Sequence, residues 1–129
     1  MGLANILRVC GVIFIIFPLG LFSNVHIFTD SWFVENATDE HIELGKTMAN
    51  ILCALCFGLG ILFLLSSFIK DVASSKLVLI GVTVSSASLL LSFIINEIGF
   101  SGSPPIPVWV GIALACALSL YGRFRVNRI

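Results

Sequence analysis

The sequence predicts an all-α integral membrane protein that folds as a four-helix bundle, with up-down-up-down topology and both termini cytoplasmic. Its composition is the first observation: 58% of its 129 residues are hydrophobic and only 11% are charged, whereas a soluble domain carries about 25% charged residues. The second is that four uncharged runs approach the ~20 residues that a helix needs to cross a membrane. We therefore expect a single four-span transmembrane domain over residues 1–129.

The first two helices follow from the first two uncharged runs. We expect a helix over approximately residues 5–25, because the run from Val9 to Thr29 contains no Asp, Glu, Lys or Arg. We expect the second over approximately residues 41–69, because the run from Thr47 to Ile69 is also uncharged. The connection between them, residues 26–40, is the long outer loop.

The end of this loop carries a helix-start signal. Thr38 is a suitable N-cap residue, and Asp39 with Glu40 would lie in the first turn, where acidic side chains favour the positive end of the helix dipole. The second helix is therefore expected to begin at about Asp39 and to protrude beyond the lipid.

The third and fourth helices follow from the other two runs. The third is expected over approximately residues 76–97, because Leu77 to Ile95 is uncharged and rich in Leu, Ile and Val. The fourth is expected over approximately residues 105–123, with its apolar stretch beginning at Val108. Since the hairpin between the second and third helices is short, these two helices should be antiparallel neighbours.

The basic residues predict the orientation, because cytoplasmic flanks of membrane spans accumulate Lys and Arg. One side of the four-span arrangement carries Arg8, Lys70, Lys76, Arg123, Arg125 and Arg128, and the other carries only Lys46. The acidic residues are sorted the opposite way, and only Asp71 lies on the basic side. We therefore expect a cell (inner) membrane protein. The zero net charge argues against nucleic acid as a partner.

Small residues recur at helical spacing and predict how the helices pack. They are Ala54 with Gly58 and Cys56 with Gly60 in the second helix, Gly81, Ser85, Ser88 and Ser92 in the third, and Gly111, Ala115, Ser119 and Gly122 in the fourth. Lipid chains are as apolar as leucine, so helices in a membrane associate where small residues let backbones approach. We expect a tight left-handed bundle within one subunit; a dedicated dimer interface is the alternative.

A few polar residues of the outer half could form a ligand site. They are His41, Glu43, Lys46, Asn50 and Glu97. A small quinone- or lipid-binding enzyme or binding module would use these side chains, and this hypothesis predicts that they converge on one cavity. Lys46 and Glu97 would instead form an ion pair if their role is structural. Asp39 and Glu43 share a helix face, but no second His follows at helical spacing, so we expect no metal and no cofactor.

Cys53 and Cys56 form a Cys-x-x-Cys pair in the second helix. The pair resembles the motif of the four-helix quinone-reducing thiol oxidases, the disulfide-bond formation B family, and that resemblance implies a redox role. Such chemistry also requires a second cysteine pair in an outer loop, whereas the other cysteines here, Cys10 and Cys116, belong to the opposite half of the membrane. The favoured interpretation is therefore that both thiols are small buried hydrophobic groups.

The whole-chain layout is similar to another family. The residues that carry this resemblance are Arg8 with Gly11, then Pro18, Leu19 and Gly20, then Glu43 and Leu44 before Gly58, Leu59 and Gly60, and finally Gly102, Ser103 and Pro104. They resemble the small DoxX-like membrane proteins of bacteria. That resemblance implies a compact four-helix bundle with cytoplasmic termini, and some members of the family accompany quinone-linked oxidoreductases as membrane subunits.

Three functions are compatible with these observations. We predict a non-catalytic accessory or structural subunit of a larger membrane complex, whose partners are membrane lipid and other membrane protein subunits, because the spans contain no polar pathway. The first alternative is the quinone- or lipid-binding module in the outer half. The second is a thiol oxidase that uses Cys53 and Cys56.

Overall fold

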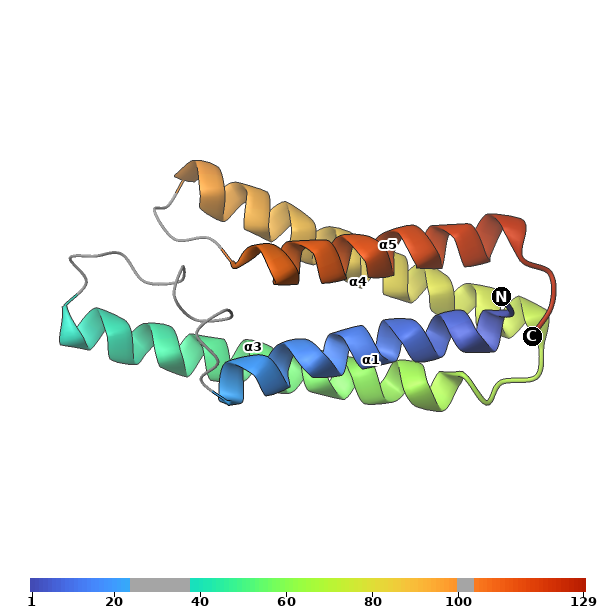
Figure 1. Cartoon of the computed structure of the whole chain (residues 1–129), viewed down its shortest axis with the longest axis horizontal. Coiled ribbons are helices and arrows are strands. Elements are labelled where there is room, and N and C mark those ends of the chain that lie inside the picture. Colours follow the sequence, from blue (N-terminus) through green and yellow to red (C-terminus); the bar gives the residue numbers. More distant parts are fainter. Residues whose placement is uncertain (24–37, 100–103) are drawn as a thin grey trace.

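The computed structural model describes residues 1–23, 38–99 and 104–129, and this part of the chain is all-helical. Its helices are α1 (Leu3–Phe22), α3 (Asp39–Ser66), α4 (Val72–Gly99) and α5 (Ile106–Arg125) (Figure 1). Each of the four is long and apolar enough to cross a membrane. The all-α prediction with four helices is confirmed, and the helices fit a small multi-pass membrane protein.

The helix boundaries differ from the expected ranges by a few residues at most ends. α3 begins at Asp39, as the helix-start signal predicts, so the last residues of the expected outer loop are helical; residues 26–37 of that loop lie outside the described part. α4 begins at Val72, earlier than the expected residue 76. The reason is Asp71, whose carboxylate accepts hydrogen bonds from the backbone N–H of Ser74 at 2.7 Å and from its hydroxyl at 2.6 Å. These bonds cap the first turn of α4.

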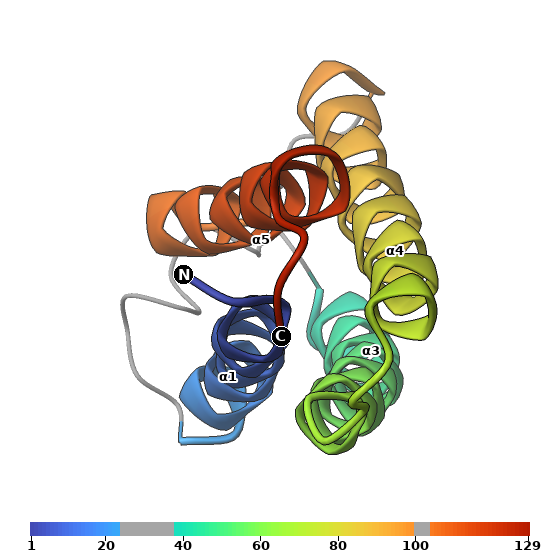
Figure 2. The same ribbon diagram turned by 90° about the vertical axis from the view of Figure 1, so that its right-hand side faces the viewer.

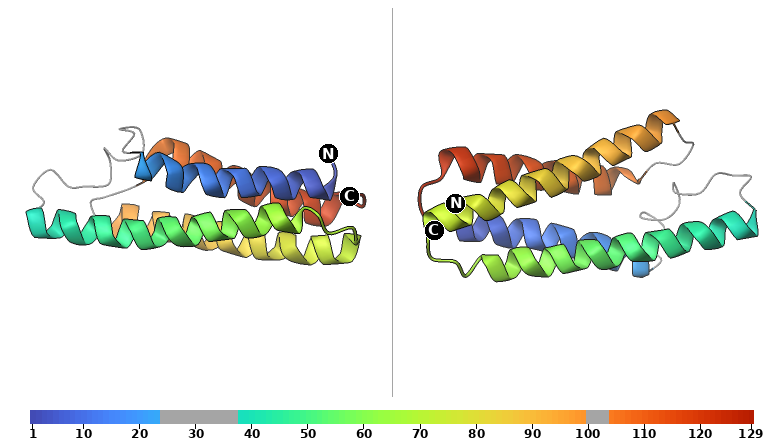
Figure 3. Two further views of the ribbon diagram at one scale, coloured as in Figure 1. Left: turned by 90° about the horizontal axis from the view of Figure 1, so that it is seen from below. Right: turned by 180° about the vertical axis from the view of Figure 1, so that it is seen from behind.

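Consecutive helices run in opposite directions, and both termini lie at the same end of the bundle (Figure 1). The backbone N–H of Leu3 donates to the carbonyl oxygen of Arg128 at 2.9 Å, which ties the two termini together. The helices form two closely packed pairs, α1 with α3 and α4 with α5, and α1 also packs against α5 (Figure 2). Away from the termini, α4 diverges from α3 (Figure 3).

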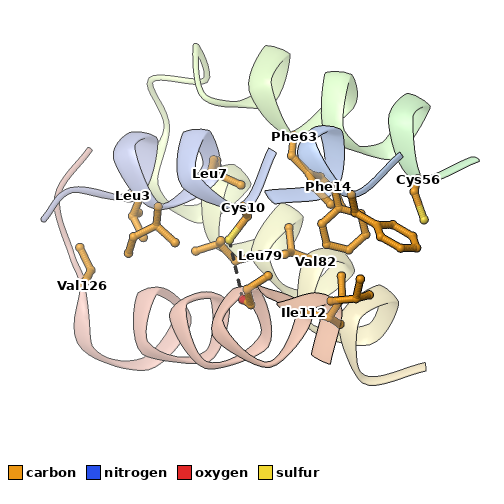
Figure 4. Close-up of a cluster of buried hydrophobic side chains, with 14 of the residues drawn as sticks. Leu3, Leu7, Cys10, Phe14, Cys56, Phe63, Leu79, Val82, Ile112 and Val126 are labelled. Carbon is orange, nitrogen blue, oxygen red and sulfur yellow. Dashed lines mark hydrogen bonds between the residues drawn. The ribbon is translucent and has the colours of Figure 1, made fainter. Parts of the chain in front are cut away.

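α1 contacts the three other described helices and buries a larger share of its residues than any of them. Its inward face contains Leu3, Ile6, Leu7, Cys10, Phe14 and Phe17, all buried (Figure 4). The Phe14 ring meets the Phe63 ring of α3 edge to face, with 5.2 Å between ring centroids and an interplanar angle of 84°. This geometry suits the charge distribution of two aromatic rings.

α1 and α3 touch backbone to backbone where Gly11 meets Gly60. A Cβ atom added to Gly60 would lie 2.7 Å from Cγ1 of Ile15 and 2.9 Å from the carbonyl oxygen of Gly11. A Cβ added to Gly11 would lie 2.8 Å from the carbonyl oxygen of Gly60. Only hydrogen fits at either position, so this pair of glycines sets the distance between the two helices.

The predicted small residues of α5 also pack inside the bundle. Ala115, Ser119 and Gly122 are buried, and the Ser119 hydroxyl lies 2.8 Å from the Thr83 hydroxyl of α4. For α4, in contrast, the prediction of packing within the subunit is wrong. Gly81, Ser88 and Ser92 are exposed and Ser85 is only half-buried.

The buried residues of α4 lie about a third of a turn away from this predicted set. They are Ser75, Leu79, Val82, Ser86 and Phe93. Larger apolar side chains of α4 thus fill the core, and the row of small residues faces outward. Ala54 and Gly58 of α3 are likewise exposed.

Candidate functional site

The polar residues predicted for an outer ligand site lie on two helices. Glu43, Lys46 and Asn50 are exposed on α3, and Glu97 is exposed on α4. His41 lies in the first turns of α3, but its side chain is outside the described part. None of these residues lines any of the three pockets described below. In the described ranges no ion pair within 4.0 Å joins Lys46 to Glu97, and α3 and α4 diverge toward this end (Figure 1).

The thiols of Cys53 and Cys56 point into the bundle. Both residues are buried, and Cys56 belongs to the core that contains Phe14 and Phe63 (Figure 4). All four cysteines of the chain are free thiols. In the other half of the bundle, the Cys10 sulfur lies 3.7 Å from the carbonyl oxygen of Ala115, and this contact joins α1 to α5. The geometry of the three buried thiols is that of packing residues.

A pocket of about 510 Å³, lined by both charged and apolar side chains, opens between the start of α4 and the end of α5. It is lined by Asp71, Val72, Ala73, Lys76, Leu77, Ile80 and Arg123. A second pocket at the same end, of about 360 Å³, is lined by Met1, Tyr121, Arg125, Val126, Asn127 and Arg128. The third, of about 180 Å³, is an apolar groove between α1 and α5, lined by Ile13, Ile16, Phe17, Pro107, Val108, Gly111 and Ile112.

Hydrogen bonds fix two of the charged groups in the first of these pockets. The Lys76 ammonium donates to Oδ1 of Asn127 at 2.6 Å, which draws it toward the C-terminal segment. The hydrogen bonds from Ser74 lower the pKa of Asp71 below its usual value, because they stabilise the ionised carboxylate. Within the described ranges no ion pair within 4.0 Å involves Lys76 or Arg123. From the sequence, these cations predict only the orientation in the membrane. Their shared pocket forms because α4 and α5 are antiparallel neighbours.

The outward row Gly81, Ser85, Ser88 and Ser92 forms a second feature, which we name the α4 small-residue face. A Cβ added to Gly81 would meet no heavy atom within 4 Å. The neighbouring Val84 and Leu91 are 59% and 58% exposed, so this side of α4 is not covered by the chain's other described helices. The same type of small residue that brings α1 and α3 into contact is therefore free on α4.

Comparison with protein-family models, curated proteins and solved structures gives no match to this chain. The DoxX-like resemblance stays a prediction. The function therefore has to be argued from the geometry of the chain's own residues.

Proposed function

We propose that this chain is a non-catalytic accessory subunit of a larger complex in the cell (inner) membrane, and that the α4 small-residue face receives a transmembrane helix of a partner subunit. The outward orientation of that face is the observation that carries the proposal. Without hydrophobic burial as a driving force, membrane helices associate through close backbone contact at small residues. α4 offers such a row, and none of the chain's other described helices uses it.

The interior of the bundle supports a structural role. Among the described residues, the buried polar side chains are Ser67, Ser75, Ser86 and Ser119, and none of the buried residues is ionisable apart from cysteine thiols. A carrier of ions or protons would need charged or strongly polar groups along a path through the spans. Of the polar residues of the outer half, Glu43, Lys46 and Asn50 are exposed on α3 and Glu97 is exposed on α4, which diverges from α3; this arrangement favours a scaffold over a catalytic site.

A double substitution on α4 tests the docking role. In the Gly81→Leu/Ser88→Leu protein, we expect the fold to persist, because both positions are exposed, and we expect recovery of partner subunits to fall at least tenfold. The measurement is purification of the tagged full chain in mild detergent, with quantitative mass spectrometry of co-eluting chains. Ala113→Leu is the matched control, because Ala113 is an exposed small residue of α5.

Two results would argue against this role. One is equal recovery of partner subunits with the double variant, the control and the wild-type chain. The other is a wild-type protein that elutes without any other subunit. Elution as a homodimer that the double variant disrupts would replace the partner subunit with a second copy of this chain.

The proposed orientation, with both termini cytoplasmic, rests on the charge at the two ends of the bundle. In the described part, the end with the termini carries Arg8, Lys70, Lys76, Arg123, Arg125 and Arg128 with Asp71, and the other end carries Lys46 with Asp39, Glu40, Glu43 and Glu97. Basic residues flanking spans are retained on the cytoplasmic side. This distribution supports an outer position for the start of α3.

Single added cysteines test the orientation. We expect a membrane-impermeant maleimide to label Glu43→Cys in sealed cells and Ile129→Cys only in inverted vesicles. Both positions are exposed, whereas native Cys10, Cys53 and Cys56 are buried, and the wild-type chain measures the background. The opposite labelling pattern would reverse the proposed orientation.

A further inference from the structure

Two basic side chains from different helices share the pocket between α4 and α5. Lys76 lies in the second turn of α4 and Arg123 in the last turn of α5, and both line the cavity of about 510 Å³. Figure 2 views the bundle from this end, where the start of α4 lies beside the end of α5. The sequence separates these residues widely, so the antiparallel packing of the two helices creates this cationic site.

The two cations are available to an anion from outside the chain. In the described ranges neither has a carboxylate within 4.0 Å, although Asp71 lines the same pocket. The Asp71 carboxylate accepts two hydrogen bonds from Ser74 and thus serves to cap α4. Among the described residues, the Lys76 ammonium has one acceptor, Asn127, and it can donate two further hydrogen bonds. The Arg123 Cζ atom lies over the Phe124 ring, 5.9 Å from its centroid, and in the described part of the chain its N–H groups have no acceptor.

The position of the pocket along α4 places it at the level of the lipid headgroups. α4 has 28 residues and is therefore about 42 Å long, which equals the ~40–45 Å thickness of a bilayer with its headgroups. Lys76 lies about 6 Å from the first residue of α4, where the ~30 Å hydrocarbon core would begin. Leu77 and Ile80 line the same pocket and are 69% and 40% exposed, so they offer an apolar wall next to the cations.

From this arrangement we infer that the pocket binds an anionic phospholipid of the leaflet next to the termini. Lys76 and Arg123 hold the headgroup phosphate by charge-assisted hydrogen bonds, and an acyl chain lies along Leu77 and Ile80. A soluble phosphate ion would use the two cations but not the apolar wall. The pocket therefore suits a phospholipid, which uses both the cations and the apolar wall, better than a soluble phosphate ion.

Titration of the purified full chain with phosphatidylglycerol, followed by native mass spectrometry, tests the site. We expect wild-type protein to bind phosphatidylglycerol in preference to phosphatidylcholine. Each basic residue removed should weaken binding about fivefold, so Lys76→Gln/Arg123→Gln should weaken it about 25-fold. Lys70→Gln/Arg125→Gln is the matched control, because it removes the same charge at the same end from residues that do not line this pocket. We expect the control to change binding less than threefold.

A second variant keeps the test decisive if the double substitution disturbs folding. Asp71→Asn removes the negative charge from the pocket while asparagine still caps a helix, so it should strengthen phosphatidylglycerol binding. Equal losses in the double variant and the control would overturn the site, as would equal binding of phosphatidylglycerol and phosphatidylcholine. Displacement of the bound lipid by inorganic phosphate at a similar concentration would assign the pocket to a soluble anion instead.

Discussion

Gly60→Val is expected to separate α1 from α3 and to lower the unfolding temperature of the bundle more than any other single substitution considered above. A valine Cβ at this position would lie 2.9 Å from the carbonyl oxygen of Gly11, and this oxygen is backbone that cannot rotate away. Overpacking in a core costs about 1–3 kcal/mol when side chains can adjust, and we expect the upper end or more here. Thermal unfolding in detergent micelles, followed by circular dichroism, measures the loss.

Gly58→Val is the matched control for this prediction. It introduces the same side chain on the same helix at a position where an added Cβ meets no heavy atom within 4 Å. Any effect of valine on helix propensity is common to both variants, so the difference between them reports the contact with α1. If both variants unfold at the same temperature, the backbone contact between Gly11 and Gly60 does not hold the helices together.

Phe14→Ala is expected to produce the second large loss of stability. Phe14 is fully buried at the centre of α1, and its ring packs edge to face on Phe63. Removing a buried phenylalanine costs about 3–5 kcal/mol in soluble proteins. We expect the lower part of that range, because a separated helix in lipid still keeps its apolar surroundings and loses only packing.

The exposed Phe57 of α3 provides the comparison for Phe14. It is 40% exposed, so Phe57→Ala should change the free energy of unfolding much less. Both variants can be measured by unfolding in mixed micelles of increasing denaturing-detergent content. A loss in Phe57→Ala as large as that in Phe14→Ala would show that the aromatic contact inside the bundle contributes little.

The spans could be predicted from the sequence because the membrane imposes a length of about 20 apolar residues on each of them. The start of α3 was predictable too, since Asp39 and Glu40 favour a first turn. The early start of α4 is harder to predict, because the charged residues between Lys70 and Lys76 favour a loop. The signal was nevertheless present in the sequence: Asp71 followed three residues later by Ser74 is a capping pattern.

The direction in which each helix faces could not be predicted. A soluble helix shows its inner side as an apolar stripe, but all sides of a membrane helix are apolar, so the pattern that would identify the buried side is absent. Gly60 and Gly81 are equivalent in sequence terms, yet the first contacts α1 and the second faces outward. Only the packing of large side chains such as Leu79 and Phe93 decides between them.

The cationic pocket was missed for a related reason. The rule that basic residues accumulate on one side of the membrane predicts the side on which Lys76 and Arg123 lie. It does not predict which basic residues become neighbours. The pairing of α4 with α5 brings the two together. Lys46 and Glu97 lie at the same end of the bundle but do not become neighbours, because their helices, α3 and α4, diverge toward that end (Figure 3).

The division into two pairs has a consequence for biosynthesis. The helices that pack most closely, α1 with α3 and α4 with α5, are consecutive in the chain. Each hairpin can thus leave the insertion machinery with its main interface already formed, before the ribosome has completed the next one. Joining the preformed halves then requires mainly the meeting of α1 with α5, with smaller contacts of α4 to α1 and α3, a late step that a newly made copy can complete within the lipid.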